Sequence, residues 1–175
     1  MSRERALLSL LACSLGLGCS ADADPEDGPL MLVEAWAPST TDPFPDHRPA
    51  TVSCPDASWQ LEEGSIEVDT GECNYLSLEQ PLLRDVDEGT PLIINMWHQA
   101  LFDEVGGLAH LALVIGDEVV WEQYIDVPGP AQIWREQITA PRDLLRDEPV
   151  VVHLHNHGAN SWNLGELEPG SDPAN

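Results

Sequence analysis

The stretch from residue 149 to residue 157, "PVVVHLHNH", has the clearest structural pattern in this chain. In a β-strand, successive side chains point to opposite faces of the sheet. One set of alternate residues is mostly apolar: Val150, Val152, Leu154 and Asn156. The other set carries the histidines: Val151, His153, His155 and His157. We therefore expect a strand whose apolar face packs into a core, with its histidines on the opposite face, exposed or lining a groove.

Similar short apolar runs continue through the chain from about residue 50 to residue 167. They are rich in Val, Ile, Leu, Trp and Thr, and Gly, Pro and Asp separate them. The expected strands are 65–70, 73–83, 90–101, 108–115, 118–127, 131–139, 149–157 and 160–167. With no alternation of strands and helices, this pattern predicts an all-β fold: a single antiparallel β-sandwich of the jelly-roll or Greek-key type.

The N-terminus has the features of a signal peptide over residues 1–18. Arg3 and Arg5 precede an apolar run of small residues that is too short to span a bilayer. The stretch "LGLGCS" resembles the lipobox of bacterial lipoproteins, in which the cysteine, here Cys19, receives acyl chains. A second stretch, "LLAC", ends at Cys13 and leaves that residue as the alternative processing site.

The cysteines favour processing at Cys19. Cleavage there removes Cys13 and leaves Cys54 and Cys73 as an even pair. Such a pair predicts a disulfide in an oxidising compartment, closing a loop that stabilises the fold by about 3 kcal/mol. The expected location is therefore the bacterial cell envelope, lipid-anchored at the outer membrane, or the periplasmic or extracellular space.

Composition divides the rest of the chain. Residues 19–48 are rich in Asp, Pro, Ser and Thr, which predicts a disordered tether after the lipidated cysteine. Within it, "LMLVEAW" (30–36) could add a strand to the folded body. The β-sandwich domain is expected over residues 49–168 and a disordered tail over 169–175.

The chain is strongly acidic, with 7 Lys+Arg against 31 Asp+Glu and a formal net charge of −24. A polyanion is repelled by nucleic acids and by anionic lipid headgroups. We therefore expect no nucleic-acid partner, and contact with a membrane only through a lipid anchor.

The histidine row also suggests a metal site. Histidines at i and i+2 lie about 6.5–7 Å apart along a strand, so two of them can share an ion that is completed from another strand. The candidate ligands of zinc or copper are His153, His155, His98 and His110. His47 falls in the predicted tether and is not expected to contribute. Otherwise the row is a strand end that turns at Gly158 and Asn160, or part of a ligand-binding groove.

Two metal-binding patterns fit only in part. "HLHNH" resembles the "HLHGH" segment of multicopper oxidases, which also use β-sandwich domains. No His-Cys-His segment follows it, which excludes a trinuclear copper site. The cupin pattern requires a glutamate where this chain has Ala159 and Asn160.

Catalytic motifs such as G-x-S-x-G, H-E-x-x-H or a glycine-rich phosphate loop do not occur in the sequence. We therefore assign no catalytic residue and expect a cell-envelope binding module for a glycan or another envelope protein, with no cofactor. The expected ligand-binding residues are Trp97, His98, His110, His153 and His155. The alternatives are a metal-binding module or small metalloenzyme that uses zinc or copper, and a scaffold without a ligand site.

Overall fold

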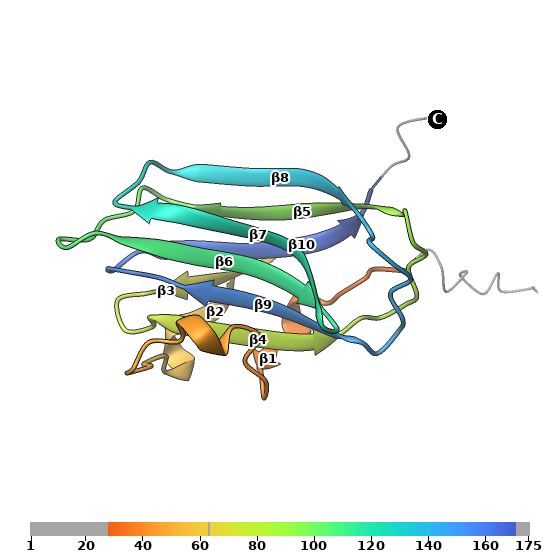
Figure 1. Ribbon diagram of the computed structural model, residues 1–175, viewed down its shortest axis with the longest axis horizontal. Helices are drawn as coiled ribbons and strands as arrows, with labels where there is room; N and C mark the ends of the chain where they lie inside the picture. Colours follow the sequence, from red (N-terminus) through yellow and green to blue (C-terminus); the bar gives the residue numbers. More distant parts are fainter. Residues whose placement is uncertain (1–27, 63, 171–175) are drawn as a thin grey trace, which may run out of the picture.

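Two five-stranded antiparallel sheets pack face to face in the computed structural model, which describes residues 28–62 and 64–170 (Figure 1). The first sheet has the order β1 (Ala37–Pro38), β4 (Tyr75–Pro81), β9 (Pro149–His155), β6 (Gly107–Ile115), β7 (Glu118–Val127). The second has the order β2 (Trp59–Glu62), β3 (Ser65–Asp69), β10 (Ser161–Pro169), β5 (Pro91–His98), β8 (Gln132–Thr139). The predicted all-β antiparallel sandwich is confirmed.

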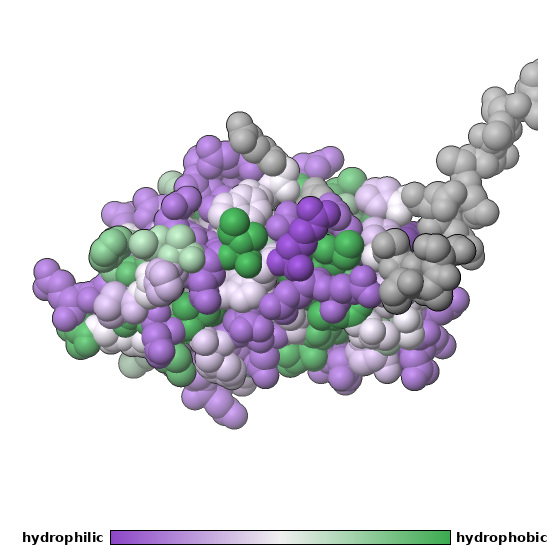
Figure 2. Space-filling model, turned by 90° about the horizontal axis from the view of Figure 1, so that it is seen from above, coloured by the Kyte–Doolittle hydropathy of each residue, from purple (hydrophilic) through white to green (hydrophobic). Residues whose placement is uncertain are grey.

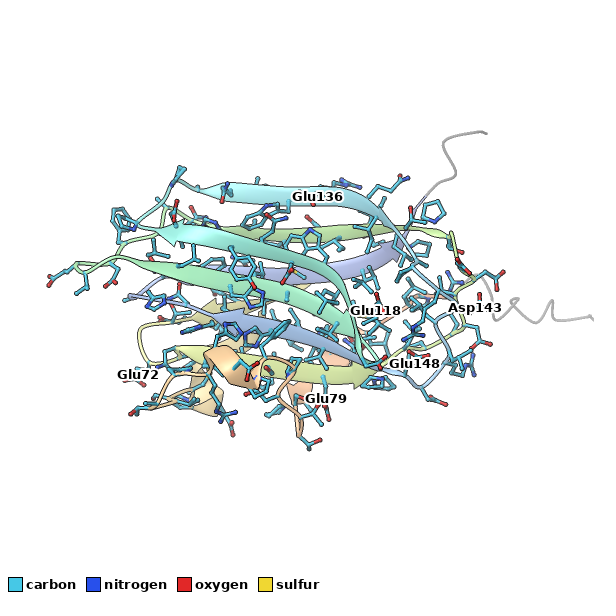
Figure 3. All side chains as sticks on the ribbon, in the orientation of Figure 1. Glu72, Glu79, Glu118, Glu136, Asp143 and Glu148 are labelled. Carbon is cyan, nitrogen blue, oxygen red and sulfur yellow. A yellow bond between two sulfur atoms is a disulfide. The ribbon has the colours of Figure 1, made fainter. Side chains whose placement is uncertain are left out.

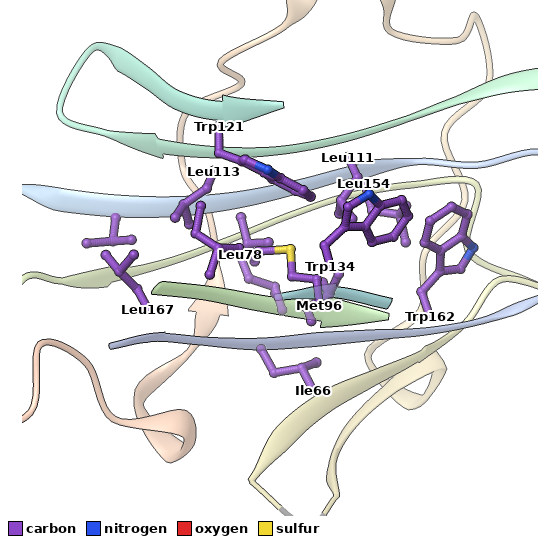
Figure 4. Packing of buried hydrophobic residues seen from close by; sticks show 14 of the residues in the cluster. Ile66, Leu78, Met96, Leu111, Leu113, Trp121, Trp134, Leu154, Trp162 and Leu167 are labelled. Carbon is purple, nitrogen blue, oxygen red and sulfur yellow. The ribbon is translucent and has the colours of Figure 1, made fainter. Parts of the chain in front are cut away.

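Strand β9 lies in the middle of the first sheet, between β4 and β6, and its apolar side faces the second sheet. Leu154 pairs across the sheet with Leu76 and Leu111. All three belong to a buried cluster to which the second sheet adds Met96 and Trp134 (Figure 4). This side of β9 is the one that the alternating pattern predicted to be buried.

A small polar network closes one end of the core. The Trp162 indole donates a hydrogen bond of 3.0 Å to the Asn156 side chain, whose amide group donates one of 2.8 Å to the Thr70 hydroxyl. The backbone N–H of Asn160 donates to the same hydroxyl at 2.8 Å. Gly158 turns the chain between β9 and β10 with a positive φ of 78°. Because each buried polar group has a partner, Asn156 can occupy a core-facing position.

Residues 28–48 pack against the sandwich, which differs from the predicted tether. Leu30 and Trp36 belong to the buried core. Between them lies a short 3-10 helix, η2 (Val33–Ala35), in place of the strand considered for this stretch, and β1 then pairs with the edge of β4. Leu30 and Trp36 therefore hold this segment on the sandwich through contacts with core residues that are distant in sequence, although its average composition is that of a disordered chain.

The predicted disulfide between Cys54 and Cys73 is confirmed. It links the loop before η4 (Asp56–Ser58) to the start of β4. Beside it, the backbone N–H of Ser53 donates to the Asn74 side chain, and the Asn74 backbone N–H donates to the Ser53 carbonyl, both at 2.9 Å. The covalent bond and these hydrogen bonds fix the start of β4 together.

The remaining predictions about the ends of the chain concern other residues. The signal peptide, Cys13, Cys19 and the tail beyond Gly170 lie outside the described residues. Across residues 28–62 and 64–170, no helix combines the length and apolar character that crossing a membrane requires.

Acidic side chains are distributed over the outside of the sandwich. Figure 3 labels six of them, which lie on β4, β7, β8 and the connecting loops. The face shown in Figure 2 is mostly hydrophilic, with separate hydrophobic patches. The labelled carboxylates therefore belong to several different elements and are not gathered on one of them.

The packing of the N-terminal segment can be tested with two leucines. Leu30 is 1% exposed and Leu32 is 39% exposed. Leu30→Ala should lower the free energy of unfolding by about 2–5 kcal/mol, because it leaves a cavity in the core. Leu32→Ala should change it by less than about 0.5 kcal/mol. Urea unfolding measures both values, and equal small effects would contradict the packed segment.

Candidate functional site

The histidines of β9 lie on the outer face of the first sheet, as the alternating pattern predicted. His155 pairs with His110 of β6 and with Tyr75 of β4, and His153 pairs with Ser77. This face is not open to solvent at His110 and His153, which are 1% and 0% exposed. Residues 39–48, which we call the covering segment, lie over it.

Phe44 and His47 supply the contacts between the covering segment and the sheet. The Phe44 ring centroid lies 4.6 Å from that of His110 and 4.9 Å from that of His153. His47, at the end of η3 (Pro45–His47), lies 4.7 Å from His110 and 5.3 Å from His153, again between ring centroids. The aromatic rings therefore pack as one group over the middle of the sheet.

Polar contacts hold the covering segment in place. The Tyr75 hydroxyl donates to Asp42 at 2.6 Å and lies 3.0 Å from the Phe44 carbonyl oxygen, an alternative acceptor. Arg48 forms an ion pair of 2.8 Å with the same aspartate. Burial and the neighbouring Asp42 carboxylate raise the pKa of Tyr75, so its hydroxyl stays protonated and acts as a donor.

One ring nitrogen from each of His47, His110 and His153 lies within 4.8 Å of the other two. One ring nitrogen of each strand residue has a partner: His153 Nδ1 lies 3.0 Å from the Ser77 hydroxyl, and His110 Nε2 lies 3.2 Å from the Glu122 carboxylate. Within this group, three ring nitrogens are buried and have no hydrogen-bond partner among the described residues: His47 Nε2, His110 Nδ1 and His153 Nε2. Outside the group, His98 Nε2 is also buried without such a partner. The three residues of the group could hold a metal ion.

Burial keeps the strand histidines neutral. It lowers the pKa of His153 to about 3, with further lowering from His110 and His47. The pKa of His155 falls to about 4 through burial and the neighbouring His157. Burial also lowers the pKa of His110, although the hydrogen bond that its ring donates to Glu122 opposes the shift. At neutral pH these imidazoles therefore carry free lone pairs.

The predicted site residues divide among three places. His110, His153 and His155 share the outer face of the first sheet. His98 lies between the two sheets, 1% exposed, with its ring centroid 4.5 Å from that of Trp162. Trp97 lies on the other side of β5, where the residues are only partly buried. The expectation of one surface that carries all five residues is therefore not met.

The sequence contains a signal that separates Trp97 from His98. In β5 the buried residues alternate: Leu92, Ile94, Met96 and His98. Three apolar residues at this period already place His98 toward the core, so it cannot complete a site on the outer face. His47 is the residue that sequence reasoning missed, because no pattern in residues 39–48 predicts that they fold back over the sheet.

The outer face of the second sheet carries a row of side chains in register. The row crosses all five strands: Gln60, Glu67, Asn163, Trp97 and Ile133. The Trp97 ring lies against the backbone at Gly165, where a β-carbon would come within 3.5 Å of it and would also meet the Asn95 carbonyl oxygen. A glycine at this position lets the β10 backbone lie close to the Asn95 carbonyl of β5, beside the Trp97 ring.

An open groove follows this row, which we call the second-sheet groove. One part is lined by Glu62, Ser65, Glu67, Trp97, Gln99, Ser161 and Asn163. A neighbouring hollow shares Glu67 and Ser161 and extends to Phe102, which is exposed. The Ser161 hydroxyl donates to Glu67 at 2.7 Å where the two parts meet. The groove is thus open and mostly polar, with aromatic rings in both parts.

The sequence matches no protein-family model and no curated protein. Three solved structures are similar in fold. One described as CBM4 shares 14% identity and a TM-score of 0.43, over 82% of this chain and 96% of that chain. A Family 16 carbohydrate-binding module shares 9% identity and a TM-score of 0.39, over 61% of this chain and 76% of that chain. TmCBM61, in complex with beta-1,4-galactotriose, shares 11% identity and a TM-score of 0.35, over 79% of this chain and 83% of that chain. These values assign neither a family nor a ligand to the chain.

The buried histidines predict a loss of stability in acid. The folded-state pKa values of His153 and His155, about 3 and about 4, lie below the ordinary 6.5. The unfolded chain therefore binds more protons than the folded chain below pH 6.5. Stability that is present above pH 6.5 should fall progressively as the pH is lowered toward 4. Urea unfolding of metal-free protein at pH 7, 5.5 and 4 measures this.

A substitution separates the histidine contribution from that of the carboxylates. In His153→Gln the decrease in unfolding free energy between pH 7 and pH 4 should be smaller than in the unsubstituted protein. Equal decreases in the two proteins would show that His153 is not the group that binds the extra proton on unfolding.

Proposed function

We propose that this protein is an extracytoplasmic binding module that holds a neutral glycan in the second-sheet groove. The observation that carries the proposal is the position of Trp97, whose ring lies beside the β10 backbone at Gly165 and lines the groove together with hydrogen-bonding side chains. Aromatic rings and convergent polar groups are the two features that recognition of a sugar requires, because a sugar presents both C–H surfaces and hydroxyl groups.

The polar side chains of the groove suit hydroxyl ligands. Glu67 offers carboxylate oxygens that accept, and Gln99 and Asn163 offer amide groups that both donate and accept. Neighbouring hydroxyls on a sugar ring also donate and accept, so each can find a partner along the groove. The existing hydrogen bonds from Ser161 and Gln60 to Glu67 hold that carboxylate in place.

Charge limits the class of glycan. The chain carries a formal net charge of −24, and Glu62, Glu67 and Asp69 line the two parts of the groove. A polysaccharide with uronate or sulfate groups would be repelled by these carboxylates. A neutral polymer of hexoses meets no such repulsion, and the open shape of the groove suits a segment of a longer chain.

The disulfide supports a location outside the cytosol. The bond between Cys54 and Cys73 belongs to the class of structural cross-links that persist in oxidising compartments. Together with the signal-peptide features and the lipobox-like stretch, it supports a lipoprotein anchored at Cys19. Acyl chains at that residue would keep the module on the cell envelope, where polysaccharides are available as ligands.

Substitution of Trp97 tests the glycan proposal. Trp97→Ala should weaken binding to a neutral polysaccharide by at least about tenfold, because the stacking surface is lost. Asn163→Ala should have a smaller effect through the loss of hydrogen bonds. A glycan array followed by titration calorimetry on the strongest neutral ligand measures both.

Tyr124→Ala is the matched control, because this exposed aromatic residue lies in β7 of the first sheet. It should leave glycan binding unchanged, and circular dichroism should show that all variants fold. Binding that survives Trp97→Ala, a preference for acidic glycans, or no glycan binding at all would contradict the proposal.

A further inference from the structure

We propose that His47, His110 and His153 bind one divalent transition-metal ion, Zn²⁺ or Cu²⁺, between the first sheet and the covering segment. The site is separate from the second-sheet groove, because it lies on the outer face of the opposite sheet. Imidazole nitrogens are ligands that both ions prefer.

The strongest observation is the set of ring nitrogens that lack partners. His47 Nε2, His110 Nδ1 and His153 Nε2 are all buried, and none has a hydrogen-bond partner among the described residues. Buried polar atoms in folded proteins are nearly always paired. His98 Nε2 is unpaired as well but lies between the sheets, whereas three unpaired ring nitrogens gathered in one cluster, two of them on almost fully buried side chains, indicate a common ligand that satisfies all three.

The spacing fits an ion after a small adjustment. A tetrahedral zinc ion with Zn–N bonds of about 2.1 Å places its ligand nitrogens about 3.4 Å apart. The three histidines already hold one nitrogen each within 4.8 Å of the others. To reduce the nitrogen–nitrogen separations from up to 4.8 Å to about 3.4 Å, the imidazole rings must move by about an ångström. The covering segment can supply the shift, because His47 lies in the short 3-10 helix η3 and not in a sheet.

The partners of the other ring nitrogens support the assignment. In metal sites, a ligating imidazole usually makes a hydrogen bond through its second nitrogen to a carboxylate, a carbonyl or water. Glu122 occupies this position on His110 Nε2, and the Ser77 hydroxyl occupies the corresponding position on His153 Nδ1. These contacts fix the orientation of both rings and leave the nitrogens of the cluster free to bind.

The charges around the cluster also favour a cation. Asp42 lies next to it through Tyr75 and Arg48, and Glu122 contacts it directly. Three neutral imidazoles leave the full charge of a divalent ion, which the strongly acidic protein attracts. Three protein ligands also leave a fourth coordination position for water or a small ligand. The His155 ring lies beside the cluster, with its centroid 5.4 Å from that of His47.

The test uses the full-length chain purified without an affinity tag and stripped with a chelator. Titration calorimetry with Zn²⁺ and with Cu²⁺, each in an excess of Ca²⁺ to occupy weak carboxylate sites, should show about one ion per chain. In the Cu²⁺ form, electron paramagnetic resonance should show coupling to imidazole nitrogens. A stoichiometry near zero, or copper coordinated only by oxygen, would overturn the proposal.

Three substitutions and one control locate the ion. His110→Gln and His47→Gln should weaken binding by more than about 100-fold, and Glu122→Gln by about tenfold through the orientation of His110. His157→Gln is the matched control, because this histidine also lies at the end of β9 but outside the cluster. It should bind the ion as the unsubstituted protein does.

His47→Gln keeps the test decisive if His110→Gln does not fold, because His47 is only partly buried and belongs to the covering segment. Added Zn²⁺ should raise the melting temperature of the unsubstituted protein but not that of His47→Gln. Full metal binding by His47→Gln, or equal loss in His157→Gln, would overturn the proposal. Glycan binding by His47→Gln should be unchanged, so failure of one proposal can be distinguished from failure of the other.

Discussion

Strand β9 is buried on both of its faces, and the rest of the molecule depends on this. It pairs with β4 on one side and β6 on the other, so its register fixes the first sheet. Val152 and Leu154 face the core, while His153 faces the covering segment. A shift of one residue would exchange these faces and place imidazoles in the core. The apolar packing therefore also sets the positions of the histidines.

Much of the sandwich could be predicted from the sequence, because each long strand carries its own alternating pattern and its own bounding turn residues. Strands β3 to β10 all coincide with predicted runs. The short strands β1 and β2 and the folding of residues 28–48 could not be predicted in this way. Leu30 and Trp36 are isolated apolar residues in a polar stretch, and only their distant partners in the core decide their place.

The histidine cluster shows the same limit. The alternation in β9 correctly predicted which face His153 and His155 occupy, and register then brings His110 beside them. His47 joins the cluster from 63 positions before His110 in the chain, through contacts of Phe44 and Tyr75 that no local pattern contains. Local periodicity therefore predicts the face on which a side chain lies, whereas the third member of the cluster depends on tertiary folding.

The two outer faces of the sandwich offer different chemistry, and the apolar core separates them. One is covered and holds neutral imidazoles, and the other is open and holds Trp97 among amides, hydroxyls and carboxylates. On the open face, the Asn95 carbonyl of β5 occupies the space that a side chain at position 165 of β10 would need. Even a methyl group there would meet the Asn95 carbonyl oxygen and force β5 and β10 apart. In a lineage that preserves this pairing of strands, position 165 should consequently remain glycine whatever side chains the open face carries.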